Sequence, residues 1–177
     1  MSYSILNLER SLNLENKLLQ KKAEKLIVIC KQKNLRVVTA ESCTGGLVSA
    51  VITSVAGSSE ILDRGFVSYS NKSKTEILGV PEGLILEFGA VSEEVSISMA
   101  EGAIRGSWAD LAVSVTGIAG PTGGSENKPV GLVHFCLAKR EMPRIPVKRM
   151  FYGSREEIRT EATGTALELL LQAAQTN

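Results

Sequence analysis

The stretch that decides the fold is Thr39-Ala40-Glu41-Ser42-Cys43-Thr44-Gly45-Gly46. It continues the apolar run that starts at Arg36 and leads into a helical pattern that starts at Leu47, so it predicts a strand, a tight turn and a helix. The first N–H groups of a helix have no partner within the helix, and the helix dipole adds positive potential at that end. The turn is therefore predicted to stabilise an anion, or an oxygen that gains negative charge.

Two interpretations of this turn are open from these eight residues. Ser42 or Thr44 can be the N-cap of the helix, a common position for serine and threonine, with the glycines forming a tight entry. Alternatively, Ser42 is a nucleophilic hydroxyl that faces the free N–H groups, while Gly45 and Gly46 let a ligand approach the backbone closely.

Composition restricts the class of protein. The 177 residues carry a formal net charge of +1, from 20 Lys and Arg and 19 Asp and Glu, so we expect neither nucleic acid nor an anionic membrane as a partner. The length predicts one domain, placed at 13–177 after a loosely ordered leader at 1–12. The start does not resemble a signal peptide, and no apolar run approaches the ~20 residues of a membrane span.

The three cysteines and the one histidine are too few and too scattered for a zinc site. An odd number of cysteines also argues against a disulfide framework, so we expect a cytoplasmic protein without a metal or a cofactor. Cys43 competes with Ser42 as a nucleophile, but a Cys–His dyad would need His134, which we interpret as a strand residue.

Apolar spacing divides the chain into alternating helices and strands. Helices are expected at 14–33, 47–55, 72–79, 81–88, 95–107 and from 154 onward, with a short helical or irregular piece at 60–64. Strands are expected at 36–40, 65–69, 111–116, 131–138 and 147–152, the last two as an antiparallel pair. This order predicts an α/β fold, a three-layer α/β/α sandwich with a mixed sheet. Trp108, after the fifth helix, is expected to pack in the core.

Small polar or glycine-rich residues follow three predicted strands, at 40–46, 68–74 and 116–125. Ligands of open α/β sheets bind beyond the carboxyl ends of the strands, so this coincidence favours Ser42 as a site residue over a simple cap. Tyr69 and Lys74 reach the same crevice if the first two strands are neighbours.

The third of these segments, Gly117–Ser125, is too rich in glycine for a simple turn and lacks the Lys-Ser/Thr ending of a P-loop. We interpret it as a nest of backbone N–H groups for a phosphate or carboxylate, with a flexible surface loop as the alternative. Lys128 is then the nearest cation for an anionic ligand.

Several ordered motifs resemble the CinA C-terminal domain family, which includes the nicotinamide mononucleotide amidases. They are Ala40–Gly46, Ala56–Ser59, Arg64–Asn71, Gly89–Ser92, Thr116–Pro121 and Lys128–Gly131. The resemblance covers nearly the whole chain and implies the stand-alone form, without the amino-terminal domain that some members carry. It implies hydrolysis of the nicotinamide mononucleotide carboxamide to nicotinate mononucleotide and ammonia, in pyridine nucleotide (NAD) salvage.

The resemblance also implies roles. Ser42 matches the nucleophile of the family, Lys74 the lysine that activates it, and Tyr69 a tyrosine of the site. The substrate-binding residues expected at the strand ends are Glu41, Cys43, Thr44, Gly45, Gly46, Arg64, Thr116, Gly117, Gly120, Gly123, Gly124 and Lys128. Arg64 and Ser92 also have an ordinary interpretation, as a surface residue and a helix cap.

Amide hydrolysis needs an activated nucleophile, an oxyanion site and an acid for the leaving nitrogen. Lys74 can accept a proton only if it is neutral for part of the time, and the N–H groups from Cys43 to Gly46 are expected to form the oxyanion hole. The expected partner is a small-molecule nucleotide, and the apolar helices would suit a homo-oligomer. Two alternatives stay open: a non-catalytic or regulatory module that binds pyridine nucleotides, and an amidase for another small amide.

Overall fold

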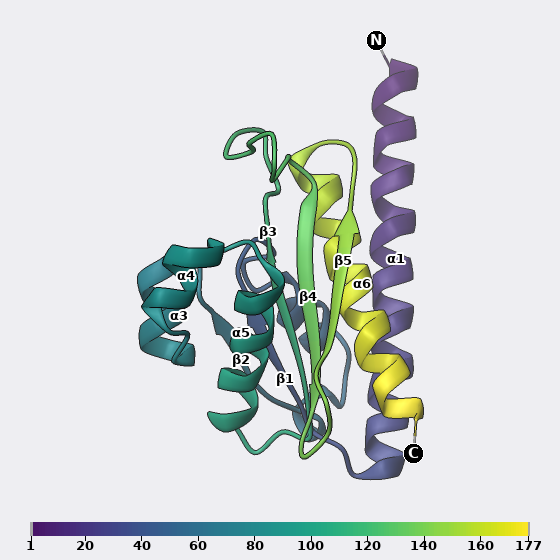
Figure 1. The fold of residues 1–177 in the computed structure, drawn as a ribbon. Helices are drawn as coiled ribbons and strands as arrows, with labels where there is room; N and C mark the ends of the chain where they lie inside the picture. The colour runs from purple at the N-terminus through teal and green to yellow at the C-terminus, as the bar shows by residue number, and fades with distance from the viewer. Residues whose placement is uncertain (1, 177) are drawn as a thin grey trace.

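The computed structural model describes residues 2–176 of the chain, with side chains from Glu15 to Thr176. Helices and strands alternate through the first part of the chain, and a strand hairpin follows (Figure 1). In chain order the elements are α1 (Ser2–Lys33), β1 (Val37–Glu41), α2 (Leu47–Thr53), η1 (Ser58–Glu60), β2 (Leu62–Val67), α3 (Asn71–Leu78), α4 (Glu82–Phe88), α5 (Glu93–Arg105), β3 (Leu111–Gly117), β4 (Leu132–Lys139), β5 (Ile145–Met150) and α6 (Arg155–Gln175).

The strands form one mixed five-stranded sheet in the order β2-β1-β3-β4-β5. β1 runs parallel to β2 and β3, whereas β4 and β5 are antiparallel to their neighbours. Glu41 at the end of β1 pairs with Val67 on one side and Val115 on the other. The carboxyl ends of β1, β2 and β3 therefore meet at one edge of the sheet, as the sequence predicts.

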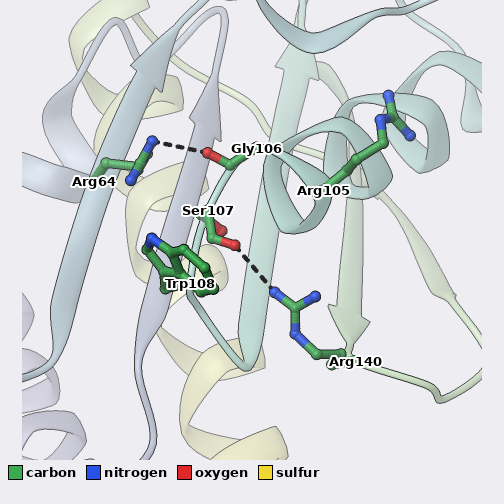
Figure 2. Close-up of a pocket in the computed structure, with 6 residues that line it drawn as sticks. All are labelled: Arg64, Arg105, Gly106, Ser107, Trp108 and Arg140. Atoms are coloured by element: carbon green, nitrogen blue, oxygen red, sulfur yellow. Dashed lines mark hydrogen bonds between the residues drawn. The ribbon is translucent and has the colours of Figure 1, made fainter.

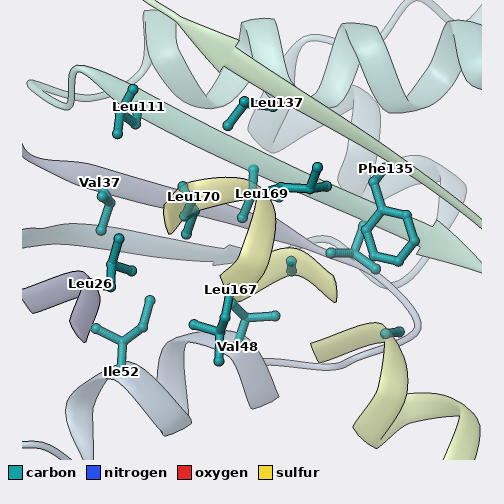
Figure 3. Packing of buried hydrophobic residues seen from close by; sticks show 14 of the residues in the cluster. Leu26, Val37, Val48, Ile52, Leu111, Phe135, Leu137, Leu167, Leu169 and Leu170 are labelled. Carbon is teal, nitrogen blue, oxygen red and sulfur yellow. The ribbon is translucent and has the colours of Figure 1, made fainter. Parts of the chain in front are cut away.

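Alternation along the strands produces two apolar cores, one on each face of the sheet. Side chains of α1, α2 and α6 pack on one face; Figure 3 shows this core, which contains Leu26, Val37, Val48, Ile52, Leu111, Phe135, Leu167 and Leu170. Side chains of α3, α4 and α5 pack on the other face against Val38, Ala40, Ala112 and Cys136. The predicted α/β/α sandwich is confirmed.

Some boundaries differ from the prediction. α1 begins at Ser2 instead of Leu14, so the backbone of 2–12 continues the helix. Met1 lies outside the described residues, and the division into a leader and a domain at 13–177 stays a prediction. β2 already begins at Leu62. The sequence pattern does not predict the first residues of this strand, because charged residues such as Asp63 and Arg64, and a glycine such as Gly65, are uncommon inside strands. A Cβ atom on Gly65 would lie 2.2 Å from Ser49 Oγ, so a larger residue there would displace the Ser49 hydroxyl from its hydrogen bonds to Thr39 and Glu41.

Trp108 does not pack in the core, and the prediction that it would was wrong. α5 ends at Arg105, and the loop that follows turns the indole ring into solvent, where it is 81% exposed (Figure 2). Met99, Ala103 and Ile104 fill the core beneath this helix instead.

Close packing between α3 and α5 generates a prediction for Gly102. A Cβ atom at this position would lie 2.0 Å from the backbone oxygen of Leu78, the last residue of α3. Gly102→Ala is expected to lower the free energy of unfolding by about 1–3 kcal/mol, because a backbone segment has to move. Denaturant titration followed by circular dichroism measures this change.

Gly83→Ala is the matched control, since this glycine lies in α4 and an added Cβ atom would meet no heavy atom within 4 Å beyond its own stretch of helix. It should be neutral or stabilising by up to about 1 kcal/mol, because alanine favours the helix. Equal losses in the two variants would contradict the packing argument.

Candidate active site

A serine and a buried lysine meet at the carboxyl edge of the sheet. Ser42, in the turn after β1, lies 2.9 Å from Lys74 Nζ of α3, measured from its Oγ atom. Ser42 is 8% exposed and Lys74 only 1%. The backbone N–H of Ser42 donates to the carbonyl of Val115 at 2.9 Å, which fixes the turn to the end of β3.

Lys74 has only neutral partners among the described residues. Besides Ser42 Oγ, its Nζ lies 3.0 Å from the carbonyl oxygen of Ser68 and 3.4 Å from that of Tyr69. No carboxylate lies within ion-pair distance of this ammonium in the described part of the chain. Burial therefore lowers the pKa of Lys74, and the proximity of Cys43 opposes this only in part.

The geometry around Nζ suits both protonation states of Lys74. An ammonium has three N–H donors, which match the three surrounding oxygens. A neutral amine has two donors for the two carbonyls and keeps one lone pair, which can accept the O–H of Ser42. The proton of Ser42 can thus pass to Lys74 without any rearrangement of the heavy atoms.

Local sequence places Lys74 at this point. Ser70 caps α3, accepting from the backbone N–H of Ser73 at 3.0 Å, while the hydroxyl of Ser73 accepts from the N–H of Ser70 at 3.1 Å. This reciprocal capping box sets the first turn of α3 directly after β2. Lys74 is the fourth residue of α3, and its side chain points back toward Ser68 and Ser42.

Glu41 holds the turn that carries Ser42. Its buried carboxylate accepts from the N–H groups of Gly46 (3.0 Å), Val48 (3.0 Å) and Ser49 (2.9 Å), and from the hydroxyls of Ser49 (2.9 Å) and Thr39 (3.1 Å). The N-cap of α2 is Gly46, with a φ of 95° and no side-chain cap of its own. Glu41 therefore takes the capping role, and the cap interpretation of Ser42 and Thr44 is wrong. The sequence placed Glu41 among the substrate-binding residues, but its oxygens are already occupied by protein donors.

The turn offers fewer free N–H groups than the sequence suggested. Those of Ser42, Gly45 and Gly46 already donate within the protein. Among the described residues, the backbone N–H groups of Cys43 and Thr44 have no oxygen acceptor; the nearest acceptor is the thiol of Cys43, a weak one. The buried hydroxyls of Thr44 and Ser68 likewise have no partner. These are the groups available to a negatively charged oxygen beside Ser42.

Cys43 is not suited to nucleophilic attack. Its thiol packs in the core formed with α1, α2 and α6, and burial raises its pKa to about 11. His134 lies within β4 opposite Thr116, as a strand residue, with Glu93 of α5 and Lys128 among the charged groups around it. The two side chains therefore lie on opposite faces of the sheet, which excludes the Cys–His dyad.

Tyr69 approaches the serine–lysine pair through its backbone. Its carbonyl faces Lys74, whereas its hydroxyl accepts from Nη2 of Arg155 at 2.9 Å, and the residue is 58% exposed. Nη1 of Arg155 donates to the carbonyl of Gly120 at 2.8 Å. Arg155 thus connects the end of β2 with the glycine-rich loop.

Two arginines of the site, Arg155 and Arg159, were not expected from the sequence. Arg159 donates to the carbonyls of Cys43 (3.1 Å) and Thr44 (2.7 Å), so it fixes the turn from the other side. Both arginines lie near the N-terminus of α6, where the helix dipole disfavours positive charge. Two arginines four residues apart, at the helix end where positive charge is unfavourable, are the sequence pattern that could have revealed a functional role.

Glycines of the loop after β3 are required by close packing. A Cβ atom on Gly117 would lie 2.7 Å from the side chain of Val133, and one on Gly124 would lie 2.9 Å from the backbone nitrogen of Val130. Gly120 and Gly123 have φ values of 74° and 88°, which glycine adopts without strain. Residues 121–127 of the loop are exposed, so the backbone there is accessible to a ligand.

Thr116 and Lys128 hold the loop against the start of α5. Thr116 Oγ1 donates to the carbonyl of Ala90 at 2.8 Å. Lys128 Nζ donates to the carbonyls of Phe88 and Val91. Two of the three ammonium donors are thus already used, which leaves one N–H for an anion. Ser92 is the N-cap of α5 and accepts from the N–H of Val95 at 3.3 Å, so its cap interpretation is confirmed.

Arg64 is separated from Ser42. It pairs with Val38, whereas Val67 at the end of β2 pairs with Glu41, so Arg64 lies about 10 Å back along the strand. Its guanidinium binds Asp63 at 2.7 Å and the carbonyl of Gly106 at 2.8 Å. The structure therefore does not bring Arg64 together with the other residues expected to bind substrate.

Metal-ligating clusters and membrane-spanning helices are both absent from the described residues. These residues contain no group of three or more His, Cys, Asp and Glu side chains placed to hold a metal ion. None of the helices within that part of the chain is long and apolar enough to cross a membrane.

Fold and site together define a class of protein: an α/β/α sandwich whose parallel strand ends hold a serine, a buried lysine and glycine-rich turns. The chain belongs to the CinA C-terminal domain family, whose model matches residues 19–174. The resemblance expected from the motifs is thereby confirmed.

Individual relatives agree with this assignment. The chain is 50% identical over 142 residues to nicotinamide-nucleotide amidohydrolase PncC of Escherichia coli (strain K12), covering 80% of this chain and 86% of that protein. It is 48% identical over 147 residues to a putative competence-damage inducible protein of Caldicellulosiruptor saccharolyticus, covering 83% of this chain and 36% of that protein. The crystal structure of competence/damage inducible protein CihA from Agrobacterium tumefaciens superposes with a TM-score of 0.86 at 45% identity, covering 90% of this chain and 96% of that one.

The buried carboxylate of Glu41 generates a stability prediction. Glu41→Gln places an amide NH2 among N–H donors and leaves at least one of them unsatisfied, so it should lower the free energy of unfolding by about 1–3 kcal/mol. Glu60→Gln is the control, because its exposed ion pair with Lys31 contributes at most about 1 kcal/mol. Denaturant titrations of the three proteins test this; a Glu41→Gln protein as stable as the control would contradict it.

Lys74 generates a prediction for the pH dependence of stability. Its folded pKa lies below the ordinary value of 10.5, so the unfolded chain binds more protons, and stability rises with pH between those two values. Lys74→Met removes this dependence. The wild type should therefore gain stability relative to Lys74→Met as the pH rises toward 10.5, by up to about 1.4 kcal/mol per pH unit.

Denaturant titrations from neutral to alkaline pH measure this difference. Lys72→Met, at an exposed position of the same helix, should follow the wild-type curve at every pH. Parallel curves for Lys74→Met and the wild type would show that burial does not perturb Lys74.

Proposed function

We propose that the protein hydrolyses the carboxamide of nicotinamide mononucleotide to nicotinate mononucleotide and ammonia, with Ser42 as the nucleophile and Lys74 as its base. The observation that carries the proposal is the 2.9 Å contact between Ser42 Oγ and the Nζ of a lysine that is buried without a carboxylate. The substrate is taken from the name of the Escherichia coli relative at 50% identity. We place the reaction in NAD salvage in the cytoplasm, with a small-molecule nucleotide as partner.

The first half of the reaction forms an acyl-enzyme. Ser42 Oγ attacks the carboxamide carbon as its proton passes to Lys74 Nζ, and the carbonyl oxygen becomes an oxyanion. The N–H groups of Cys43 and Thr44 are free to stabilise this oxyanion. As the intermediate collapses, Lys74 returns the proton to the nitrogen, the C–N bond breaks, and ammonia leaves.

The second half releases the product. A water molecule attacks the ester carbon while Lys74 accepts one of its protons, and the intermediate collapses to the carboxylic acid and the free hydroxyl of Ser42. The acid then loses its proton to solvent as nicotinate mononucleotide leaves. Lys74 passes the proton back to the serine oxygen in this step. The lowered pKa of Lys74 favours both halves, since the shift is toward the working pH, where a proton acceptor is most effective.

Substrate binding in this proposal uses the rim around the serine. Arg155 offers a guanidinium beside the glycine-rich loop, and remaining N–H groups of that loop and of Lys128 complete a cationic surface for the 5′-phosphate. Tyr69, exposed and hydrogen-bonded to Arg155, lies where it can contact the pyridine ring. Anchoring the phosphate holds the carboxamide over Ser42, so remote binding energy assists the chemical step.

Two substitutions test the proposal through ammonia release from nicotinamide mononucleotide. Ser42→Ala and Lys74→Met should each lower kcat by at least about 1000-fold, because each removes a group that takes part in every turnover. Both should remain folded, since neither introduces a buried charge.

Lys72→Met is the matched control for Lys74→Met and should keep wild-type turnover. Wild-type kcat in the Ser42→Ala protein would refute the nucleophile assignment. Tight binding of the mononucleotide in calorimetry, without ammonia release by the wild type, would instead support the non-catalytic module. Faster turnover of free nicotinamide or glutamine would support an amidase for another small amide.

A further inference from the structure

A pocket separate from the candidate active site lies at the opposite end of the sheet from Ser42. It has a volume of about 660 Å³ and is lined by Arg64, Arg105, Gly106, Ser107, Trp108 and Arg140 (Figure 2). These residues surround the loop between α5 and β3, near the amino ends of the parallel strands. The volume lies within the range of about 300–1,000 Å³ that small-molecule sites occupy.

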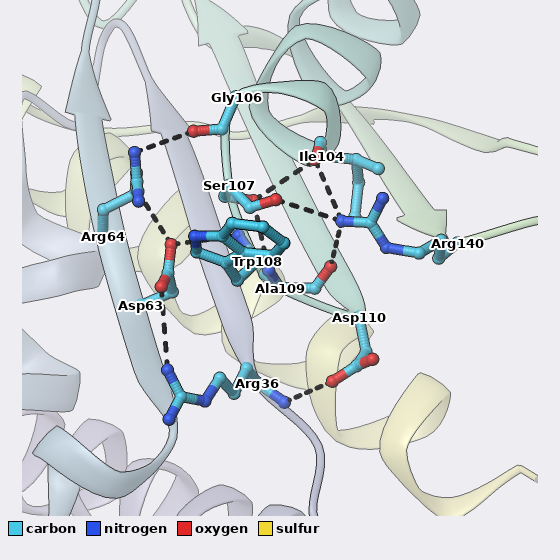
Figure 4. A network of polar contacts seen from close by, with 10 residues as sticks. All are labelled: Arg36, Asp63, Arg64, Ile104, Gly106, Ser107, Trp108, Ala109, Asp110 and Arg140. Carbon is cyan, nitrogen blue, oxygen red and sulfur yellow. Dashed lines mark hydrogen bonds and ion pairs between the residues drawn. The ribbon is translucent and has the colours of Figure 1, made fainter.

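Side chains from outside the loop that presents Trp108 bind the backbone of that loop. Nη2 of Arg140 lies 3.2, 3.1 and 2.9 Å from the carbonyl oxygens of Ile104, Ser107 and Ala109 (Figure 4). Arg64 binds the carbonyl of Gly106, as described above. The backbone N–H of Trp108 contacts Asp63 Oδ2 at 3.4 Å. The indole ring itself extends into solvent from this anchored backbone, so an aromatic face is open to a ligand.

The pocket carries excess positive charge. Asp63 is the carboxylate paired with Arg64, whereas within the described chain no carboxylate lies within 4.0 Å of the guanidinium of Arg105 or Arg140. Arg105 donates through Nη2 to the carbonyl of Leu78 at 3.1 Å, and Arg140 uses the single nitrogen described above. Each guanidinium has five N–H donors, so several stay available to a ligand.

We propose that this pocket binds a phosphorylated compound with a flat aromatic ring, such as a nucleoside monophosphate. Its phosphate would lie on the guanidinium of Arg140 and on that of Arg105, which would turn from the carbonyl of Leu78 toward the pocket; guanidinium groups match phosphate oxygens in geometry and charge. Its ring would stack on Trp108, because an exposed indole gains contact area from a planar partner. The site is separate from Ser42, and the inference does not rest on the proposed amidase activity.

Trp108 is the only tryptophan of the chain, so its fluorescence reports on this pocket directly. The probe is AMP, which has no carboxamide; adenosine and inorganic phosphate are titrated in parallel. AMP should quench the fluorescence of the wild-type protein saturably. Adenosine and phosphate should each bind at least about tenfold more weakly, because each lacks one of the two anchors.

Arg105→Gln should raise the dissociation constant for AMP about tenfold, since it removes charge-assisted hydrogen bonds. Arg149→Gln, at an exposed position of β5, is the matched control and should bind AMP as the wild type does. If Arg105→Gln unfolds, Trp108→Ala serves as the second variant, with binding measured by calorimetry. Its ring has little packing to lose, so the fold should persist while AMP affinity falls.

Several outcomes would overturn the proposal. These are the absence of saturable quenching at millimolar AMP, and an unchanged dissociation constant in both pocket variants. Quenching that depends on protein concentration, together with the mass of two chains in sedimentation, would assign the pocket to a second copy instead. Quenching by an oligonucleotide but not by AMP would assign it to nucleic acid.

Discussion

The site depends on one constraint: an amine is buried with no counter-ion among the side chains that the structure describes. Three elements have to meet for Lys74 to lie among the oxygens of Ser42, Ser68 and Tyr69, namely the turn after β1, the end of β2 and the first turns of α3. A fully charged ammonium would be costly there, whereas an amine that loses its proton easily is tolerated. The same burial that costs stability prepares Lys74 to exchange a proton with Ser42. Burial of Lys74 therefore lowers the stability of the fold while it favours proton exchange, and the packing around the residue offsets the lost stability.

Glu41 shows the complementary solution for a buried charge. Its carboxylate is as inaccessible as Lys74, but it is surrounded by backbone and hydroxyl donors at the N-terminus of α2. These hydrogen bonds fix the turn from inside, while Arg159 binds the carbonyls of Cys43 and Thr44 from outside. The turn is consequently rigid, and the N–H groups of Cys43 and Thr44 are left with no oxygen acceptor among the residues that the structure describes. Preorganised donors of this kind need no reorganisation when charge develops.

Sequence patterns were sufficient for the elements that depend on local signals. The three strand ends with small polar residues, the cap at Ser92, and the antiparallel pair formed by β4 and β5 all follow from spacing and capping chemistry. They were insufficient where tertiary contacts decide. Arg64 and Lys74 look alike in sequence as cations near the second strand, but the register of β2 directs one away from the serine and the helix after it directs the other inward. Sequence patterns placed Glu41 in the turn, but they could not show that it caps α2, because the N–H groups that donate to its carboxylate lie five to eight residues further along the chain.

Arg105 joins the two ends of the molecule through one hydrogen bond. Its side chain lines the Trp108 pocket and also donates to the carbonyl of Leu78, the last residue of the helix that carries Lys74. An anion that drew Arg105 into the pocket would remove this bond from the C-terminus of α3. A hydrogen bond from a charged donor contributes about 1.5–3 kcal/mol, so the coupling between the two sites is bounded by roughly that amount. Coupling is reciprocal: the factor by which a pocket ligand changed the affinity of the Ser42 site for its ligand is the factor by which a ligand at Ser42 would change the affinity of the pocket. Gly102 packs against the same carbonyl, so the end of α3 lies in close contact with α5 at this point.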